Sequence, residues 1–257
     1  MPESIRSPIS TDNSLKRARE RLILAVDTSD INEARRYLDE LYEHVGVFKI
    51  GLQLFTHYGP EILKIFQNAD AKIFLDCKYL DIPNTVAKAC EAATDHGVQM
   101  FTVHASGGSE MLKAASTAVK SAAEKSGKTP PTILAVTVLT SISAEVLQKE
   151  LSVNLDLEEQ VLKLARQCKE SGVMGIVASP EEVSSLRQEL GSEMLIVTPG
   201  VRPSWADAND QKRFTTPGQA IKNGADFLVV GRPITSASDP KDAARRVVAE
   251  IEEALGQ

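Results

Sequence analysis

The sequence has few of the features that mark a metal-binding, disulfide-bonded or exported protein. Its three cysteines, Cys77, Cys90 and Cys168, are odd in number and far apart, with no CxxC pair and no metal-ligand spacing. The first 20 residues lack the apolar core of a secretory signal, and no apolar run approaches the length of a membrane span. These absences predict a cytoplasmic protein with reduced thiols, no bound metal and no membrane association.

The chain also lacks a surplus of basic residues and has few aromatic ones. Its 29 Lys and Arg against 35 Asp and Glu give a net charge of −6, and no run of basic residues forms a patch. Nucleic-acid binding is therefore not expected, and a phosphate ligand would need positive groups gathered locally against the overall sign. Because aromatic residues make up only 5% of the chain, the core is expected to consist mainly of Leu, Ile, Val and Ala.

Short apolar runs alternate with segments of helical periodicity, a pattern that predicts parallel strands joined by helices. The expected strands are residues 21–26, 45–50, 72–75, 99–103, 132–138, 175–178, 194–198 and 226–230. Eight such units with short connections favour one (β/α)8 TIM-barrel domain over residues 21–257, preceded by a flexible tail at 1–20 that turns helical from Ser14. An open doubly wound sheet is the alternative, although no GxGxxG turn follows the first strand.

The third expected strand ends in three charged residues, Asp76, Lys78 and Asp81. Because side chains alternate between the faces of a strand, Asp76 and Lys78 should point the same way and Cys77 the other way. Charged clusters in clefts are enriched at active sites. A structural salt bridge at the mouth of the barrel explains the same pattern, and both readings stay open at this point.

Other polar residues fall at the carboxyl ends of the expected strands, where barrel enzymes place their active sites. They are Asp27, Lys49, Thr140, Arg202, Gly231 and Arg232. Gly231 and Arg232 precede the last helix, a common position for a phosphate site, and a tight turn with a surface arginine is the alternative. Gln211 lies in a long polar connection, residues 202–216, that can fold over a ligand or stay solvated.

These residues carry a resemblance. The segment Asp76-x-Lys78-x-x-Asp81, continued by Ile82-Pro83-Asn84-Thr85-Val86, is similar to the signature of the orotidine 5′-phosphate decarboxylase family. Segments at 198–203, 210–213 and 229–232 match further family motifs in order. The resemblance implies a (β/α)8 barrel that converts orotidine 5′-phosphate to UMP and carbon dioxide, the last step of de novo pyrimidine synthesis, without cofactor or metal. The sequence departs from the commonest family pattern at Tyr79-Leu80.

The resemblance also implies a role for each matched position near the pyrimidine and the ribose. Lys78 would donate the proton to C6, with Asp76 beside the departing carboxylate. Lys49 would complete the charge array and touch the ribose together with Asp27. Thr140 would bind near the pyrimidine.

The remaining matched positions imply a phosphate grip and a second subunit. Gln211, Gly231 and Arg232 would hold the phosphate together with Arg202. Asp81 and Thr85 would reach into the active site of a partner subunit, which implies a homodimer with shared sites.

Three alternatives remain at this stage. A metal-dependent sugar-phosphate lyase of the same superfamily shares the Asp76-x-Lys78-x-x-Asp81 pattern and would use its acids as metal ligands. A Schiff-base aldolase would use Lys78 as a neutral nucleophile, which the flanking acids oppose. A catalytically inactive barrel would bind ligand or dimerise without turnover.

Overall fold

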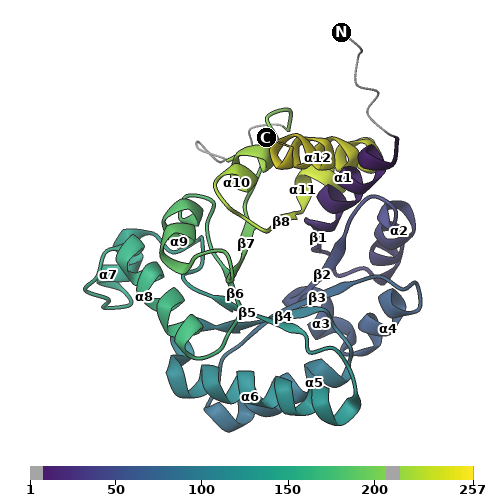
Figure 1. The fold of residues 1–257 in the computed structure, drawn as a ribbon. Helices are drawn as coiled ribbons and strands as arrows, with labels where there is room; N and C mark the ends of the chain where they lie inside the picture. The colour runs from purple at the N-terminus through teal and green to yellow at the C-terminus, as the bar shows by residue number, and fades with distance from the viewer. Residues whose placement is uncertain (1–7, 207–214, 257) are drawn as a thin grey trace.

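The computed structural model describes residues 8–206 and 215–256. Eight parallel strands close into a barrel in sequence order, β1-β2-β3-β4-β5-β6-β7-β8, with β8 paired to β1. The helices form a ring around this barrel (Figure 1). The predicted (β/α)8 fold is confirmed, and the open doubly wound alternative is wrong.

The strands lie close to their predicted positions. They are β1 (Leu22–Val26), β2 (Val47–Gly51), β3 (Ile73–Tyr79), β4 (Met100–His104), β5 (Thr132–Val136), β6 (Gly175–Val177), β7 (Leu195–Pro199) and β8 (Phe227–Val230). Strand β3 is longer than the prediction of 72–75, so Asp76 and Lys78 lie within the strand rather than beyond it. The strand continues because Tyr79 still pairs with Val103 of β4.

The helices differ from prediction mainly where short elements interrupt the connections. They are α1 (Pro8–Glu20), α2 (Ile31–Leu41), α3 (Leu52–Tyr58), α4 (Glu61–Gln67), α5 (Pro83–Asp95), α6 (Gly108–Ser126), α7 (Ala144–Lys149), α8 (Leu157–Glu170), α9 (Val183–Leu190), α10 (Pro217–Lys222), α11 (Arg232–Thr235) and α12 (Pro240–Leu255), with a 3-10 turn η1 (Ala105–Gly107). The helical spacing of residues 54–68 predicts one continuous helix, but Gly59, with φ +58°, and Pro60 divide it into α3 and α4. Helices α7 and α11 were not predicted.

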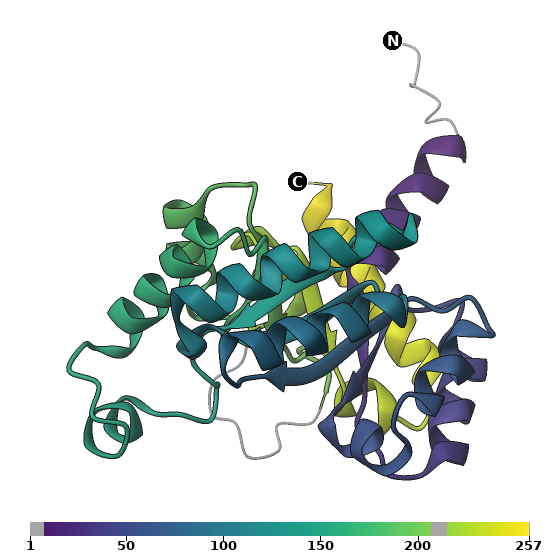
Figure 2. The same ribbon diagram turned by 90° about the horizontal axis from the view of Figure 1, so that it is seen from below.

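The segment expected to be a flexible tail contains a helix. Helix α1 begins at Pro8, before the expected start at Ser14, and lies beside α12 (Figures 1 and 2). Ala18 is fully buried, and the Ser14 hydroxyl donates a hydrogen bond to Glu252 on α12. Because the segment is mostly polar, the sequence did not predict that one of its faces packs on the barrel. Residues 1–7 of the predicted tail lie outside the described residues.

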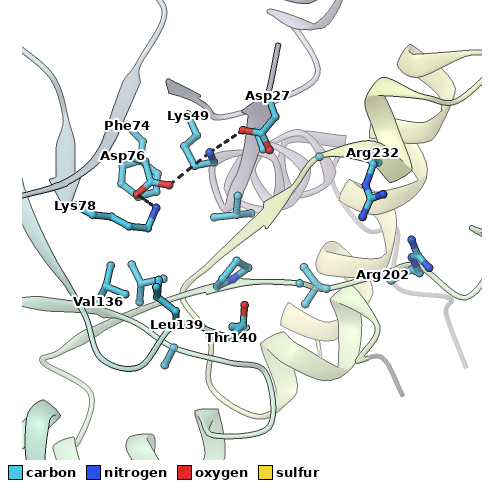
Figure 3. A pocket seen from close by; sticks show the side chains of 18 of the residues that line it. Asp27, Lys49, Phe74, Asp76, Lys78, Val136, Leu139, Thr140, Arg202 and Arg232 are labelled. Atoms are coloured by element: carbon cyan, nitrogen blue, oxygen red, sulfur yellow. Dashed lines mark hydrogen bonds and ion pairs between the residues drawn. The ribbon is translucent and has the colours of Figure 1, made fainter. Parts of the chain in front are cut away.

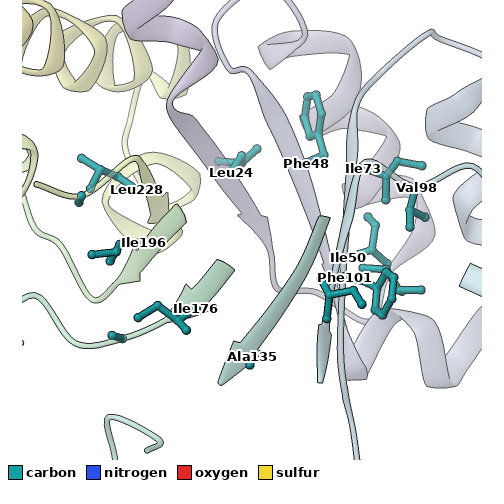
Figure 4. Close-up of a cluster of buried hydrophobic side chains, with 14 of the residues drawn as sticks. Leu24, Phe48, Ile50, Ile73, Val98, Phe101, Ala135, Ile176, Ile196 and Leu228 are labelled. Atoms are coloured by element: carbon teal, nitrogen blue, oxygen red, sulfur yellow. The ribbon is translucent and has the colours of Figure 1, made fainter. Parts of the chain in front are cut away.

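Two apolar layers hold the barrel together. The outer layer packs the strands against the helices and includes Leu24, Phe48 and Phe101 (Figure 4). The inner layer fills the barrel with Ile23, Ala25, Val47, Phe74, Met100, Leu134, Val197 and Val229. Each fully buried Leu, Ile or Phe stabilises the fold by about 1.5 to 3 kcal/mol. None of the helices in the described part of the chain is both long and apolar enough to cross a membrane.

Candidate active site

The centre of the site is an irregularity in strand β3. Leu75 pairs with Phe101 of β4, but the next pair along is Tyr79 with Val103, so residues 76–78 lie opposite Thr102 alone. Lys78 has φ +52°, in the left-handed region that a residue with a long side chain rarely adopts. Irregularities of this kind re-aim side chains and are common next to active sites.

Four charged side chains of alternating sign run across β1, β2 and β3 (Figure 3). The Lys49 Nζ lies 3.0 Å from Asp27 Oδ1 and 3.5 Å from Asp76 Oδ2. The Lys78 Nζ lies 2.8 Å from Asp76 Oδ1. The side chain of Asp76 is 13% exposed and that of Lys49 is 10% exposed. Each buried charge therefore has an opposite charge beside it, which offsets the cost of removing it from water.

The surroundings of Asp76 keep its carboxylate ionised. Burial by itself would raise the pKa of Asp76, but the ammonium groups of Lys49 and Lys78 and the hydrogen bonds from Lys78 and Thr102 outweigh burial. The pKa of Asp76 is lowered as a result. At neutral pH the centre of the site is an anion held between two lysines.

These charges form one wall of a cavity of about 360 Å³ at the carboxyl ends of the strands. A second wall, from β5 to β7, is mainly apolar and includes Val136, Val177 and Val201. Arg202 and Arg232 lie across the cavity from Lys78 (Figure 3). A ligand with a negative group at the arginine end and a flat body against the apolar second wall would match this cavity.

Most of the site residues predicted from sequence meet in this cavity. It is lined by Asp27, Lys49, Asp76, Lys78, Thr140, Arg202, Gly231 and Arg232. Asp81 and Thr85 are exposed and do not line it, and the Asp81 carboxylate accepts a hydrogen bond from the backbone N–H of Ile82. Gln211 lies outside the described residues.

One polar residue of the site was not predicted from the sequence. Thr102 is fully buried on β4, and its hydroxyl donates to Asp76 Oδ1 at 3.0 Å. It is flanked by Phe101 and Val103 and is the first polar residue in an apolar strand. That position was the available signal, because a buried hydroxyl needs a partner.

Other residues that can carry metal or thiol chemistry lie apart from the cavity. In residues 8–206 and 215–256, no three His, Cys, Asp or Glu side chains are grouped so that they could hold a metal ion. Cys77 points away from the barrel interior and packs against the outer apolar layer, as predicted. Burial and the nearby Asp76 raise the pKa of the Cys77 thiol to about 11.

Comparison with known proteins agrees with this geometry. The family model "Orotidine 5'-phosphate decarboxylase / HUMPS family" matches residues 20–247. The orotidine 5'-phosphate decarboxylase of Syntrophomonas wolfei is 48% identical over 92% of this chain and 99% of its own length. That of a Nostoc species is 48% identical over 90% of this chain and 97% of its own.

Solved structures show the same relationship. The crystal structure of orotidine 5'-phosphate decarboxylase from Lactobacillus acidophilus is 40% identical, covers 90% of this chain and 98% of its own, and has a TM-score of 0.80. An uncharacterized conserved protein from Geobacillus kaustophilus is 32% identical, covers 89% of this chain and 99% of its own, and has a TM-score of 0.78. With a family model spanning most of the barrel and relatives this similar over nearly their whole length, the chain belongs to the orotidine 5'-phosphate decarboxylase / HUMPS family.

Proposed function

We propose that this protein decarboxylates orotidine 5′-phosphate to UMP and carbon dioxide. The observation that carries the proposal is a single cavity with Lys78 in an alternating charge chain at one end and two arginines at the other. The relatives named above carry this activity in their names, which supports the same assignment.

The chemistry requires a cation at the pyrimidine C6. When the bond between C6 and the carboxylate breaks, its electron pair stays in an orbital in the plane of the ring, where the π system cannot delocalise it. A fixed ammonium aimed at that carbon stabilises the developing charge. Lys78 then transfers a proton, so that its N–H bond breaks and the C6–H bond of UMP forms while carbon dioxide leaves.

Asp76 and Lys49 organise this ammonium. The 2.8 Å contact between Asp76 and Lys78 fixes the direction of the Lys78 side chain. Lys49 holds the other oxygen of Asp76 and also contacts Asp27. We assign Asp27 and Lys49 to the ribose hydroxyls, because they lie between Lys78 and Gly231 along the cavity wall.

The opposite end of the cavity suits a phosphate. Arginine binds phosphate oxygens through paired hydrogen bonds, and Arg202 and Arg232 both line the cavity beside Gly231. We assign the pyrimidine to the side of Thr140 and the apolar wall, and Gln211 to the phosphate. This grip is remote from C6, so its binding energy can serve to organise the reacting end.

The decisive experiment follows the absorbance change of orotidine 5′-phosphate in wild type and Lys78→Ala. We expect Lys78→Ala to lower turnover about a thousandfold or more. Lys64→Ala, in an exposed pair with Glu61 on α4, is the matched control and should turn over normally. Turnover that survives Lys78→Ala would sink the mechanism.

Two reagents added to this assay distinguish the decarboxylase from the metal-dependent lyase and the Schiff-base aldolase. We expect no cofactor and no metal in the reaction, so a chelator should leave turnover unchanged, and loss of turnover on chelation would favour the metal-dependent lyase. Borohydride with a carbonyl substrate should trap nothing on Lys78, whereas a trapped adduct would favour the aldolase. A protein that binds UMP but never turns over would be the inactive barrel. The cytoplasmic location stays a prediction.

We further propose a homodimer in which Asp81 and Thr85 complete the site of the partner subunit. Both residues are exposed, and Asp81 lies between Leu80 and Ile82, which are 53% and 66% exposed. Exposed apolar side chains grouped in this way are typical of a surface that another protein covers.

Mixing two inactive variants tests the shared site. A dimer of one Lys78→Ala chain and one Asp81→Ala chain would have one site with both changes and one with neither. Random pairing should therefore restore about a quarter of wild-type activity. If mixing restores nothing although the chains exchange, Asp81 does not act across the interface.

A further inference from the structure

Thr102 contacts both partners of the ion pair between Asp76 and Lys78. Its hydroxyl donates to Asp76 Oδ1 at 3.0 Å and accepts from the backbone N–H of Lys78 at 2.8 Å. A hydroxyl has one donor hydrogen, and here the carboxylate receives it. The side chain is fully buried, and the described residues that line the cavity do not include it.

The strand pairing explains why a side chain is needed here. Residues 76–78 of β3 lie opposite Thr102 alone, so the regular ladder of backbone hydrogen bonds is interrupted beside Lys78. A buried backbone N–H without a partner is costly, and the left-handed conformation of Lys78, at φ +52°, adds a further cost. The Thr102 hydroxyl supplies the missing acceptor at this point.

The same hydroxyl also fixes the orientation of the Asp76 carboxylate. Thr102 Oγ1 and Lys78 Nζ both approach Asp76 Oδ1, which leaves Oδ2 to face Lys49. A quarter turn of the carboxylate about its Cβ–Cγ bond would break the contact with Thr102 and would move both oxygens out of line with the two lysines. One buried hydroxyl thus fixes the backbone that carries Lys78 and the carboxylate that aims it.

We infer that Thr102 is a positioning residue for the decarboxylation, acting on Lys78 through the backbone and through Asp76 without touching the substrate. This inference rests on the proposed function. Removing the hydroxyl should leave both reacting groups present but misplaced. A misplacement of about 1 Å in a reacting group can slow a reaction about a hundredfold.

Two substitutions at this position test the inference. Thr102→Val removes the hydroxyl at nearly constant shape and should lower kcat about 10- to 100-fold, with the KM for orotidine 5′-phosphate within about threefold of wild type. Thr102→Ser keeps the hydroxyl and should recover most of kcat. If Thr102→Val does not fold, Thr102→Cys, which keeps a weak donor, should give an intermediate kcat.

A second buried threonine serves as the control. Thr94 on α5 is 1% exposed, and its hydroxyl donates to the backbone oxygen of Cys90, away from the cavity. Thr94→Val should lower thermal stability and leave kcat unchanged. Equal kcat values for Thr102→Val and Thr94→Val would overturn the inference, and so would equal losses in Thr102→Val and Thr102→Ser.

Two further measurements distinguish this inference from the proposed function. Turnover by the wild type tests the function alone, and every Thr102 variant is then compared with that rate. A crystal structure of Thr102→Val tests the positioning without turnover, since the 2.8 Å contact between Asp76 and Lys78 should open. An unchanged contact would overturn the inference whatever the wild type does.

Discussion

The amino-end half and the carboxyl-end half of the barrel interior use the same strands and opposite kinds of side chain. Val47, Phe74 and Met100 belong to the inner apolar layer near the amino ends. Two residues further along the same strands, on the same face, lie Lys49, Asp76 and Thr102. We call the inner apolar layer the apolar floor, and Asp27, Lys49, Asp76 and Lys78 the charged rim.

The two halves contribute to different properties. The apolar floor stabilises the barrel because its burial removes apolar surface from water. The charged rim is a poor source of stability, since replacing buried ion pairs with apolar side chains of similar volume is often neutral or stabilising. The rim is better explained by function, and changes in the two halves should separate activity from stability.

The largest effect should come from the centre of the charged rim. Asp76→Asn keeps the size of the side chain but leaves Lys49 and Lys78 without the anion between them. We expect kcat/KM for orotidine 5′-phosphate to fall about a thousandfold, because the ammonium loses its fixed direction. Steady-state kinetics measure this loss.

A surface carboxylate is the control for this change. Glu61→Gln, in the exposed pair with Lys64 on α4, should leave kcat/KM unchanged. If Asp76→Asn kept more than about a tenth of wild-type activity, the charged rim would not organise the reaction.

A substitution in the apolar floor should have the opposite effect, lowering stability and leaving activity nearly unchanged. Leu134→Ala removes a fully buried side chain from the inner layer, and we expect the free energy of unfolding to fall by about 2 to 5 kcal/mol. Urea denaturation measures this change, while kcat of the folded fraction should stay within about threefold of wild type. Leu151→Ala, at a 52% exposed position, is the control. A collapse of kcat in folded Leu134→Ala would remove the distinction between floor and rim.

Much of the contrast between the apolar floor and the charged rim was predictable from the sequence, because it follows from local rules. The period of two along a strand placed Asp76 and Lys78 on one face, and the structure confirms their contact. Eight repeated units predicted the barrel and hence the end at which the site lies. The Gly59-Pro60 pair was a local signal for the break between α3 and α4, but one continuous helix was expected there.

The rest depends on contacts between distant segments. The left-handed Lys78 and its bond to Thr102 arise from the pairing of β3 with β4, which local patterns do not specify. Helix α1 is polar along most of its length, and only its packing on α12 reveals the buried Ala18. Asp81 lies outside the cavity of its own chain, so its proposed role depends on a second subunit.

A smaller effect should come from the arginines across the cavity from the rim. Arg232→Ala should raise the KM for orotidine 5′-phosphate about 10- to 100-fold, because a hydrogen bond to a charged group contributes about 1.5 to 3 kcal/mol. The same variant should process orotidine, which has no phosphate, as slowly as the wild type does. Arg35→Ala, exposed on α2, is the control. Equal losses with both substrates would remove Arg232 from the phosphate site.

The smallest effect should appear in the pH dependence of stability. Because the pKa of Asp76 is lowered in the folded protein, its anion stabilises the fold above the unfolded pKa of about 4, and this contribution declines as the pH falls through the folded pKa. The wild type should therefore lose stability more steeply than Asp76→Asn below about pH 4. Urea denaturation at a series of pH values measures the difference.

A carboxyl group outside the charged rim provides the opposite case. Burial raises the pKa of Glu182 to about 7, although its carboxylate accepts a hydrogen bond from the backbone N–H of Ser179. A raised carboxyl pKa favours the protonated folded state, so stability should decline as the pH rises from about 4 to about 7. Glu182→Gln should remove that decline and gain stability relative to the wild type near neutral pH. If Asp76→Asn and Glu182→Gln shifted the pH profile in the same direction, the paired lysines would not be what distinguishes the rim carboxylate from an ordinary buried acid.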